Sequence, residues 1–411
     1  MTLGERGVKG TVGPERMNPA RNVLVAAAFS SLAMVGVFHT LLGAALPAIR
    51  SSFGIDVVRS GILGSAAWLG FTMVVLAGGT LSDFIGRRRI LILACSIMGI
   101  CSVLLGMPRA YWLNGVLFAL IGGGTGMIVS TSSALVMELF PRKEGMMMNV
   151  HHFFYAVGAI AGPLAMGAVL AKGGQWESIY RMAGILMLVL GGAFLYMKMS
   201  GEERPLRQGL ASPWWILRKR NLLILVLITL FGMGAQNGIS YWLVSFLKEI
   251  RGFPILLSGL GLSLFSIGMA AGRLVSGWLA AHHGNTKVLL TLFITLHVGL
   301  FLLLHVVVEV GILFVCFLLG MGCSGLFPGL LALGGLNFPR WAGTTMGLLG
   351  TAAGVGSTVM PWLMSVASKR TSLRTGFYTA QLVGLVAFGL LLVSLKSLSG
   401  SERKGMEGGH E

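Results

Sequence analysis

Long apolar runs, broken by short polar segments, fill most of this 411-residue chain. Twelve of the runs are long enough to cross the hydrocarbon core of a membrane as a helix, which takes about 20 apolar residues. They cover roughly residues 22–46, 58–81, 90–107, 112–137, 149–170, 178–198, 222–247, 258–280, 287–307, 310–335, 344–367 and 375–396. The pattern predicts an all-α membrane protein with twelve transmembrane helices.

The composition agrees with a membrane setting. Only 11% of the residues are charged, against roughly 25% in an ordinary soluble protein. Glycine is abundant, with 61 residues, and small residues let helix backbones approach closely in lipid. The four cysteines fall inside predicted spans without the spacing of a metal site. We therefore expect no disulfide, no metal and no other cofactor.

The net charge of +17, from 31 basic and 14 acidic residues, could suggest a nucleic-acid partner. The basic residues form no long run, however, and lie as short clusters in the loops. If the N-terminus is cytoplasmic, 20 of them fall on the cytoplasmic side and 10 on the other, as the positive-inside rule expects. The charge thus predicts a multi-pass protein of a bacterial-type inner (plasma) membrane, with both termini cytoplasmic and no nucleic-acid partner.

The chain is an internal duplication. The polar stretch 199–221 divides the apolar runs six and six, and the two halves align at a constant offset of 198. At that offset Gly79 falls on Gly277, Gly122 on Gly320, Phe140-Pro141-Arg142 on Phe338-Pro339-Arg340, and Pro163 on Pro361. We expect two pseudo-symmetric six-helix bundles over 22–198 and 222–396, joined by a cytoplasmic linker and flanked by cytoplasmic tails at 1–21 and 397–411. Two such halves favour a secondary transporter, with its substrate bound near the bilayer midplane.

The loop between the second and third spans carries a recognisable motif, Gly79-Thr-Leu-Ser-Asp83-Phe-Ile-Gly86-Arg87-Arg88-Arg89. It resembles the signature of the major facilitator superfamily at every diagnostic position. In that family the aspartate and the following arginine belong to a charge network that latches the two halves together. The resemblance implies a conformational latch of Gly79, Asp83, Gly86 and Arg87, with Glu138 as the arginine's acidic partner. The alternative is that these residues only set the topology.

Two further segments resemble the fucose/glucose-permease-like transporters. One runs from Asn149 to Pro163 and includes His152, and the other begins at Gly232 and includes Gln236. That subgroup commonly carries an acidic residue at the position of Gln236. A glutamine can form hydrogen bonds but cannot take up a proton, so the departure leaves the solute and the coupling ion open.

Polar residues inside spans should face a cavity or one another, because an unsatisfied polar group in lipid is costly. The candidates for substrate binding are His39, Gln236, Asn237, Tyr241, Tyr155 and Ser132. The repeat offset places His39 opposite Asn237, as neighbours across the cavity, and the glycines around Gln236 permit a local unwinding. His39 and His152 are candidates for proton coupling. Each candidate has a simpler interpretation, as a residue that hydrogen-bonds to a neighbouring helix or to its own.

Acidic residues are missing at mid-depth, and one basic residue, Arg273, lies inside a span. We expect the Arg273 side chain to extend toward the cytoplasmic interface. The sequence as a whole predicts a monomeric secondary active transporter, not an enzyme, that moves a small polar, sugar-like solute by proton-coupled alternating access. Efflux of hydrophobic or drug-like compounds and uncoupled facilitation are the alternatives.

The latch is testable by removing one charge. Asp83→Asn should impair transport while the amount of protein in the membrane stays the same, because the amide preserves the shape of the side chain without its charge. Uptake assays on membranes matched for protein content measure this. Normal transport by the variant would show that Asp83 only sets the topology.

Overall fold

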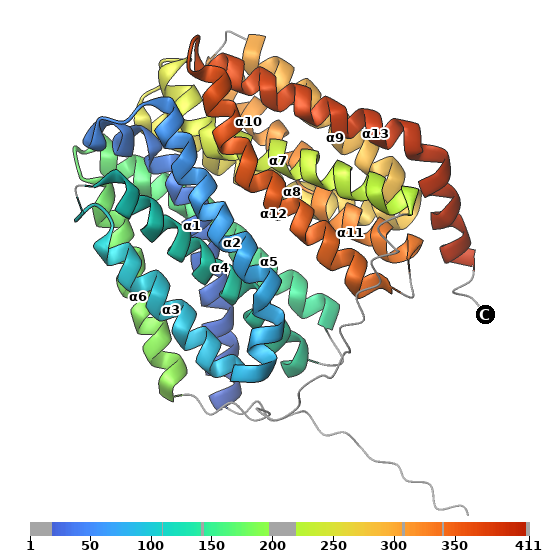
Figure 1. The fold of residues 1–411 in the computed structure, drawn as a ribbon, viewed down its shortest axis with the longest axis horizontal. Helices are drawn as coiled ribbons and strands as arrows, with labels where there is room; N and C mark the ends of the chain where they lie inside the picture. Colours follow the sequence, from blue (N-terminus) through green and yellow to red (C-terminus); the bar gives the residue numbers. More distant parts are fainter. Residues whose placement is uncertain are drawn as a thin grey trace, which may run out of the picture.

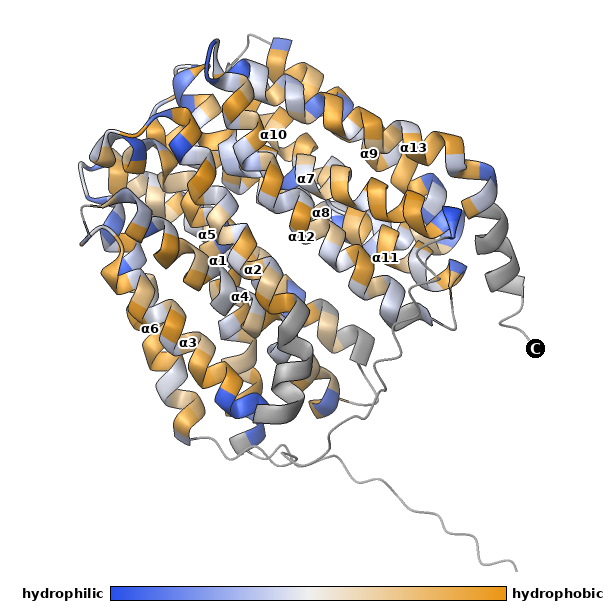
Figure 2. Cartoon of the chain, viewed as in Figure 1, coloured by the Kyte–Doolittle hydropathy of each residue, from blue (hydrophilic) through white to orange (hydrophobic). Residues whose placement is uncertain are grey.

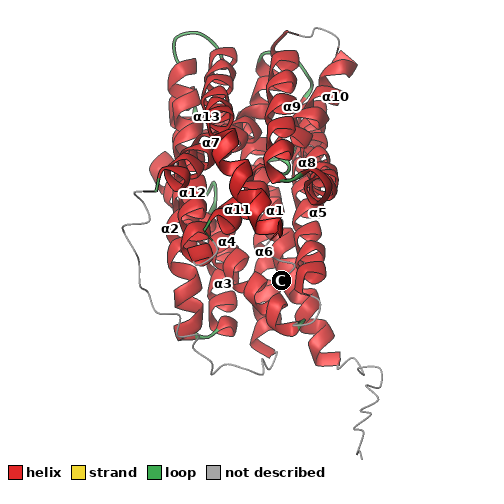
Figure 3. Ribbon diagram, turned by 90° about the vertical axis from the view of Figure 1, so that its right-hand side faces the viewer, coloured by secondary structure: helices red, strands yellow, loops and turns green. Residues whose placement is uncertain are grey.

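The structure, a computed structural model, describes residues 19–108, 110–140, 144–196, 219–305, 309–338 and 341–407. Within these ranges it is built of helices without strands (Figure 3). The helices are α1 (Pro19–Phe53), α2 (Val57–Ile85), α3 (Arg87–Leu104), α4 (Tyr111–Leu139), α5 (Glu144–Ala171), α6 (Trp176–Tyr196), α7 (Arg220–Glu249), α8 (Ile255–His283), α9 (Asn285–His305), α10 (Glu309–Cys323), α11 (Leu326–Asn337), α12 (Ala342–Ser368) and α13 (Leu373–Glu407). Most of the predicted linker and of the N-terminal tail lies outside the described residues.

Each predicted span falls on a helix, with one correction. The run 310–335, expected as a single helix, is broken into α10 and α11 at Ser324 and Gly325. Pro328 contributes to the break, because a proline has no N–H to donate to the carbonyl four residues earlier, which belongs to Ser324. A proline alone does not require a break in this chain, since α1, α5 and α12 continue through Pro47, Pro163 and Pro361. Pro328 itself is tolerated in the first turn of α11, where the helix needs no such bond.

The helices are suited to a bilayer. Ten segments are long and apolar enough to cross it; the other two predicted spans fall on α3, which begins with three arginines, and α12, which is rich in small residues. Large apolar side chains such as Leu274 and Val393, each 77% exposed, lie on the outer surface. Hydrophobic residues run along the helices and hydrophilic ones gather near their ends (Figure 2).

The helices form two bundles with the same internal packing. In the first, α1 packs against α5 and α2 against α4; in the second, α7 packs against α12 and α8 against α10. Two helix pairs, α2 with α12 and α5 with α8, make the main contacts between the bundles. Figure 1 shows the N-terminal bundle in blue and green beside the C-terminal bundle in yellow to red.

Glycines bring the helix backbones together at equivalent places in both bundles. A methyl group on Gly122 would collide with the carbonyl oxygen of Ala67, and one on Gly320 with that of Phe265. Both members of the second pair stand 198 residues after those of the first. The turns repeat as well: Gly86 and Gly284 have φ angles of 91° and 86°, in the region that favours glycine. The repeat therefore reproduces backbone contacts and turns, beyond the order of the helices.

The bundles touch mainly away from the chain termini. The helices α1, α7 and α12 all begin at one end of the bundles, which we call the termini end. The opposite end is called the far end. Near the far end Arg50 forms an ion pair with Glu249, and Gly61 lies directly against Ser365. Ser263 Oγ donates to the carbonyl oxygen of Ile160 at 2.9 Å in the far half of α5 and α8. The bundles converge toward this end and diverge toward the termini end (Figure 1).

A single added methyl group tests the close approach of α2 and α4. Gly122→Ala should cost about 1–3 kcal/mol, as overpacking of a tight contact does, and should lower the unfolding temperature in detergent by several degrees. Gly192→Ala in α6 is the matched control, because an added methyl there meets nothing within 4 Å. Cys95, Cys101, Cys316 and Cys323 are buried, so a thiol-reactive dye reports unfolding. Equal unfolding temperatures for the two variants would contradict the packing.

Candidate functional site

His39, near the middle of α1, is held by two side chains of its own bundle. Its Nδ1 lies 3.1 Å from the Tyr155 hydroxyl and its Nε2 3.3 Å from Thr125 Oγ1. The Thr125 hydroxyl donates its hydrogen to the Gly122 carbonyl at 2.7 Å, so it can only accept from His39. A neutral His39 ring therefore carries its proton on Nε2 and accepts the Tyr155 hydroxyl at Nδ1.

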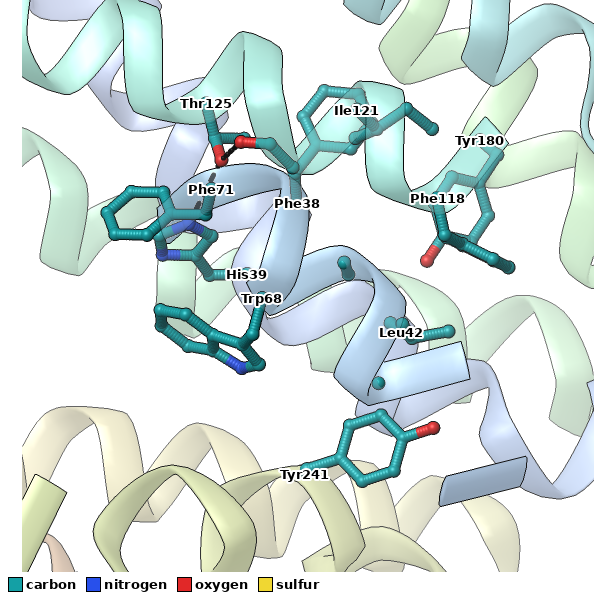
Figure 4. A pocket seen from close by; sticks show the side chains of 13 residues that line it. Phe38, His39, Leu42, Trp68, Phe71, Phe118, Ile121, Thr125, Tyr180 and Tyr241 are labelled. Carbon is teal, nitrogen blue, oxygen red and sulfur yellow. Dashed lines mark hydrogen bonds between the residues drawn. The ribbon is translucent and has the colours of Figure 1, made fainter. Parts of the chain in front are cut away.

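A pocket opens beside this histidine. It contains about 490 Å³ of empty space, part of it open to solvent, and draws its walls from α1, α2, α4, α6 and α7. His39, Trp68 and Phe71 form one end, and Phe118 and Tyr180 the other (Figure 4). The ring centroids of His39 and Trp68 are 5.2 Å apart, so the imidazole is part of an aromatic wall.

Tyr241 brings the C-terminal bundle to the pocket. It extends from α7, and its hydroxyl donates to the Ser60 carbonyl on α2. Its ring covers Gly64, where an added Cβ would stand 2.6 Å from it. Tyr241 thus lines the pocket and ties the two bundles together at the far end.

Arg273 lies elsewhere than the sequence predicted. Instead of extending to the interface, its guanidinium lies 6.0 Å from the centroid of the Tyr155 ring, across the junction of α8 and α5. Its Nε donates to the Ser324 carbonyl at 3.4 Å, which is the carbonyl that Pro328 leaves free.

No acidic side chain among those described pairs with Arg273. A cation at mid-depth in a membrane protein is costly unless it is compensated. The signal was present in the sequence, since Arg273 is the basic residue inside a span and no carboxylate lies at its depth. What the sequence lacked was the direction in which α8 points the side chain.

Three other candidates do not line the pocket. Asn237 donates to Ser357 Oγ at 2.6 Å. Ser132 is fully buried, donates to the Ile128 carbonyl and lies 3.1 Å from His151 Nε2. These partners favour the simpler interpretation of Asn237 and Ser132 as interhelical or core residues. Gln236 is buried, and its Oε1 has no partner among the described residues.

His39 and Asn237 each hydrogen-bond within their own bundle, and Asn237 is not among the residues that line the pocket, so their expected position as neighbours across a cavity stays a prediction. The expected unwinding of α7 is wrong, because the helix runs unbroken from Arg220 to Glu249. Its glycines serve packing instead. Gly234, for example, lies against the backbone of Gly356 on α12.

The described part of the latch lies inside the N-terminal bundle. Arg87, at the start of α3, forms an ion pair with Glu138 at the end of α4 and donates to the Ala134 carbonyl at 3.2 Å. Gly86 precedes α3 in the positive-φ turn. The side chains of Gly79 and Asp83 lie outside the described residues, so the contact expected between the halves stays a prediction.

The sequence model of the Major Facilitator Superfamily matches residues 28–361, and again residues 257–409. The first match alone spans most of the chain. The chain therefore belongs to the Major Facilitator Superfamily, a family of membrane transporters for small molecules, as its signature motif and its two bundles indicated. It is a transporter and not an enzyme.

Curated relatives carry different solutes. The chain is 25% identical over 369 residues to a probable sulfoacetate transporter of Cupriavidus necator, which covers 80% of this chain and 83% of the relative. It is 24% identical to a cis,cis-muconate transport protein of Acinetobacter baylyi, over 63% of this chain and 66% of the relative. It is 21% identical to a glucose/mannose transporter of Bacillus subtilis, over 88% of this chain and 93% of the relative.

Solved structures share the fold. A bacterial homologue of the human lysosomal transporter Spinster, in an inward-facing and occupied conformation, superposes with a TM-score of 0.79 over 94% of this chain and 99% of that chain, at 11% identity. A D-xylose–proton symporter superposes with a TM-score of 0.71 over 90% of this chain and 97% of that chain, at 15% identity. At these identities the likeness establishes the architecture alone.

Tyr241→Phe should loosen the far end, because it removes the hydrogen bond from α7 to α2 without opening a cavity. Spin labels on Lys172→Cys and Lys369→Cys, both exposed and in different bundles, measure the separation, since the native thiols are buried. We expect a longer distance or a second, longer population. Tyr378→Phe is the control, because that hydroxyl contacts His305 within the C-terminal bundle. Identical distance distributions for the two variants would contradict the role of Tyr241.

Proposed function

We propose that this chain is a secondary active transporter that carries a small organic anion by alternating access, with Arg273 binding the anionic group. Arg273 is the observation that carries the proposal. It lies at mid-depth where α5 and α8 join the two bundles, and it has no acidic partner among the described side chains. A guanidinium in such a place is suited to bind a carboxylate or a sulfonate from the solute.

The relatives support this choice of charge. Sulfoacetate and cis,cis-muconate, which two of them carry according to their names, are both anions. A glucose/mannose transporter is also among the relatives, and the sequence alone favoured a sugar-like solute. A neutral sugar would leave the charge of Arg273 uncompensated, so we propose an organic anion in place of a sugar.

Alternating access follows from where the bundles touch. The contacts of Arg50, Gly61 and Tyr241 close the far end. With both termini on the cytoplasmic side of a bacterial inner membrane, as the basic loops indicate, this is a state open to the cytoplasm. Rocking the bundles about the middle of α2–α12 and α5–α8 would break these contacts and expose the same site to the other side.

Proton coupling is part of the proposal, with His39 and His152 as the groups that take up the proton. His152 lies on α5, the helix whose Tyr155 ring faces the Arg273 guanidinium. An anion bound to Arg273 would offset the positive charge that a proton adds at this junction of the helices. Anion and proton would therefore enter the site together, which is the requirement of a symporter.

Uptake into proteoliposomes, with and without an inward proton gradient, tests the function. We expect the gradient to drive accumulation of at least one of sulfoacetate, cis,cis-muconate and benzoate, with no accumulation of glucose. Arg273→Gln should reduce the uptake more than tenfold, because a charged hydrogen bond to the solute is lost. Thermal unfolding of the variant in detergent checks that it remains folded, because the change also affects the hydrogen bond from Arg273 Nε to the Ser324 carbonyl.

Arg370→Gln, which changes an exposed arginine in the turn between α12 and α13, is the matched control and should transport normally. Accumulation of glucose but of no acid, or unchanged anion uptake in Arg273→Gln, would contradict the proposal.

A further inference from the structure

Aromatic rings make up one end of the pocket beside His39. The rings of His39, Trp68 and Phe71 line this end. The rings meet one another edge-on or tilted, with 5.3 Å between the centroids of Trp68 and Phe71. Aromatic rings favour such edge-on and offset contacts with a further ring. A flat, unsaturated skeleton would fill the space and extend the same packing.

Most polar atoms of the pocket are already in use. Both ring nitrogens of His39 have partners, the Thr125 hydroxyl donates to Gly122, and the Tyr241 hydroxyl donates to Ser60. A polyhydroxylated solute would leave several of its own hydroxyls unpaired here, each at a cost in free energy. The pocket therefore favours an apolar skeleton.

The Tyr180 hydroxyl and the indole N–H of Trp68 are exceptions among the described residues. The Tyr180 side chain is only 1% exposed and lines the pocket, and its hydroxyl has no hydrogen-bond partner among the described residues. A buried hydroxyl without a partner is costly, and a polar group on a bound molecule would satisfy it. Tyr180 lies at the end of the pocket away from His39 and Trp68 (Figure 4).

Tyr155 connects the pocket to the anion-binding arginine. Its hydroxyl contacts His39 at 3.1 Å, and its ring lies 6.0 Å from the Arg273 guanidinium. A solute with its anionic group at Arg273 would therefore pass along Tyr155 and place its skeleton between the rings. Its other end would point toward Tyr180.

We infer that the transported anion is an aromatic or conjugated carboxylic acid, with its carboxylate at Arg273, its flat skeleton against His39, Trp68 and Phe71, and a second polar group at Tyr180. The inference rests on the proposed function, because it takes Arg273 as the anion-binding residue.

Binding of matched acids to the purified full-length protein tests the flat skeleton. Benzoate and cyclohexanecarboxylate have the same charge and ring size, but only benzoate is flat and aromatic. By titration calorimetry in detergent at neutral pH, we expect benzoate to bind about five- to tenfold more tightly, the gain from a few aromatic contacts.

The two proposals fail in different ways. Equal affinities for the two acids, both lost in Arg273→Gln, would overturn the flat skeleton and leave the anion transporter intact. Binding of neither acid would overturn the inference about the skeleton, while gradient-driven uptake of sulfoacetate would still support the anion transporter. Binding that Arg273→Gln leaves unchanged would overturn both proposals. The comparison of the acids uses the wild-type protein, so it does not depend on a variant that folds.

Two variants separate the parts of the pocket. Trp68→Leu should abolish the preference for benzoate, whereas Trp278→Leu, at a tryptophan of α8 that is 62% exposed, should retain it. 4-Hydroxybenzoate should bind the wild type more tightly than benzoate does, and Tyr180→Phe should remove that gain without changing the affinity for benzoate. The phenylalanine has the same shape and breaks no internal hydrogen bond. Retention of the gain in Tyr180→Phe, or of the benzoate preference in Trp68→Leu, would overturn the assignment.

Discussion

The positive charge of Arg273, at mid-depth between two helical bundles, is the constraint on which the proposed chemistry of the site depends. A guanidinium can be kept there only if neighbouring groups share the cost of removing it from water. The protein supplies the Ser324 carbonyl and the face of the Tyr155 ring. Neither neutralises the charge. An anion that completes the site would therefore lie between the two bundles. Arg273 is in the C-terminal bundle, and Tyr155, His39 and His152 are in the N-terminal one.

The two bundles share a frame but differ in their chemistry. Glycines at equivalent positions, such as Gly122 and Gly320, let carbonyl oxygens and Cα atoms meet directly in each half. On this common frame the N-terminal bundle carries the aromatic pocket, while the C-terminal bundle carries the cation and the broken helix of α10 and α11. At the position of His39 the second bundle has Asn237, which is bonded to Ser357. The duplication thus supplies the mechanics of two rocking halves, and the site comes from the differences between them.

The positions of the spans and the internal repeat could be predicted because both can be recognised in the sequence without knowledge of any contact. A run of apolar residues must be a helix in lipid, and an offset of 198 is visible without any contact. The break at Ser324 is different, because hydropathy does not change across it. The proline that follows, Pro328, is not a sufficient signal, since α5 continues through Pro163. The site residues depend on information that no single span contains. Ser132 and Asn237 are used by other helices, because His151 and Ser357 happen to face them. Arg273 is turned toward Tyr155 by the way α8 packs on α5, and the hydrogen bond from Ser263 to the Ile160 carbonyl is one contact of that packing.

The proposed mechanism requires that an organic anion neutralises the charge of Arg273 between the bundles. Cryo-electron microscopy of the protein with cis,cis-muconate, a flat dicarboxylate, tests this most directly. We expect one carboxylate within hydrogen-bond distance of the Arg273 guanidinium and the conjugated chain against Trp68 and His39. An Arg273 side chain paired with a carboxylate of the protein, with muconate bound elsewhere or absent, would contradict the account.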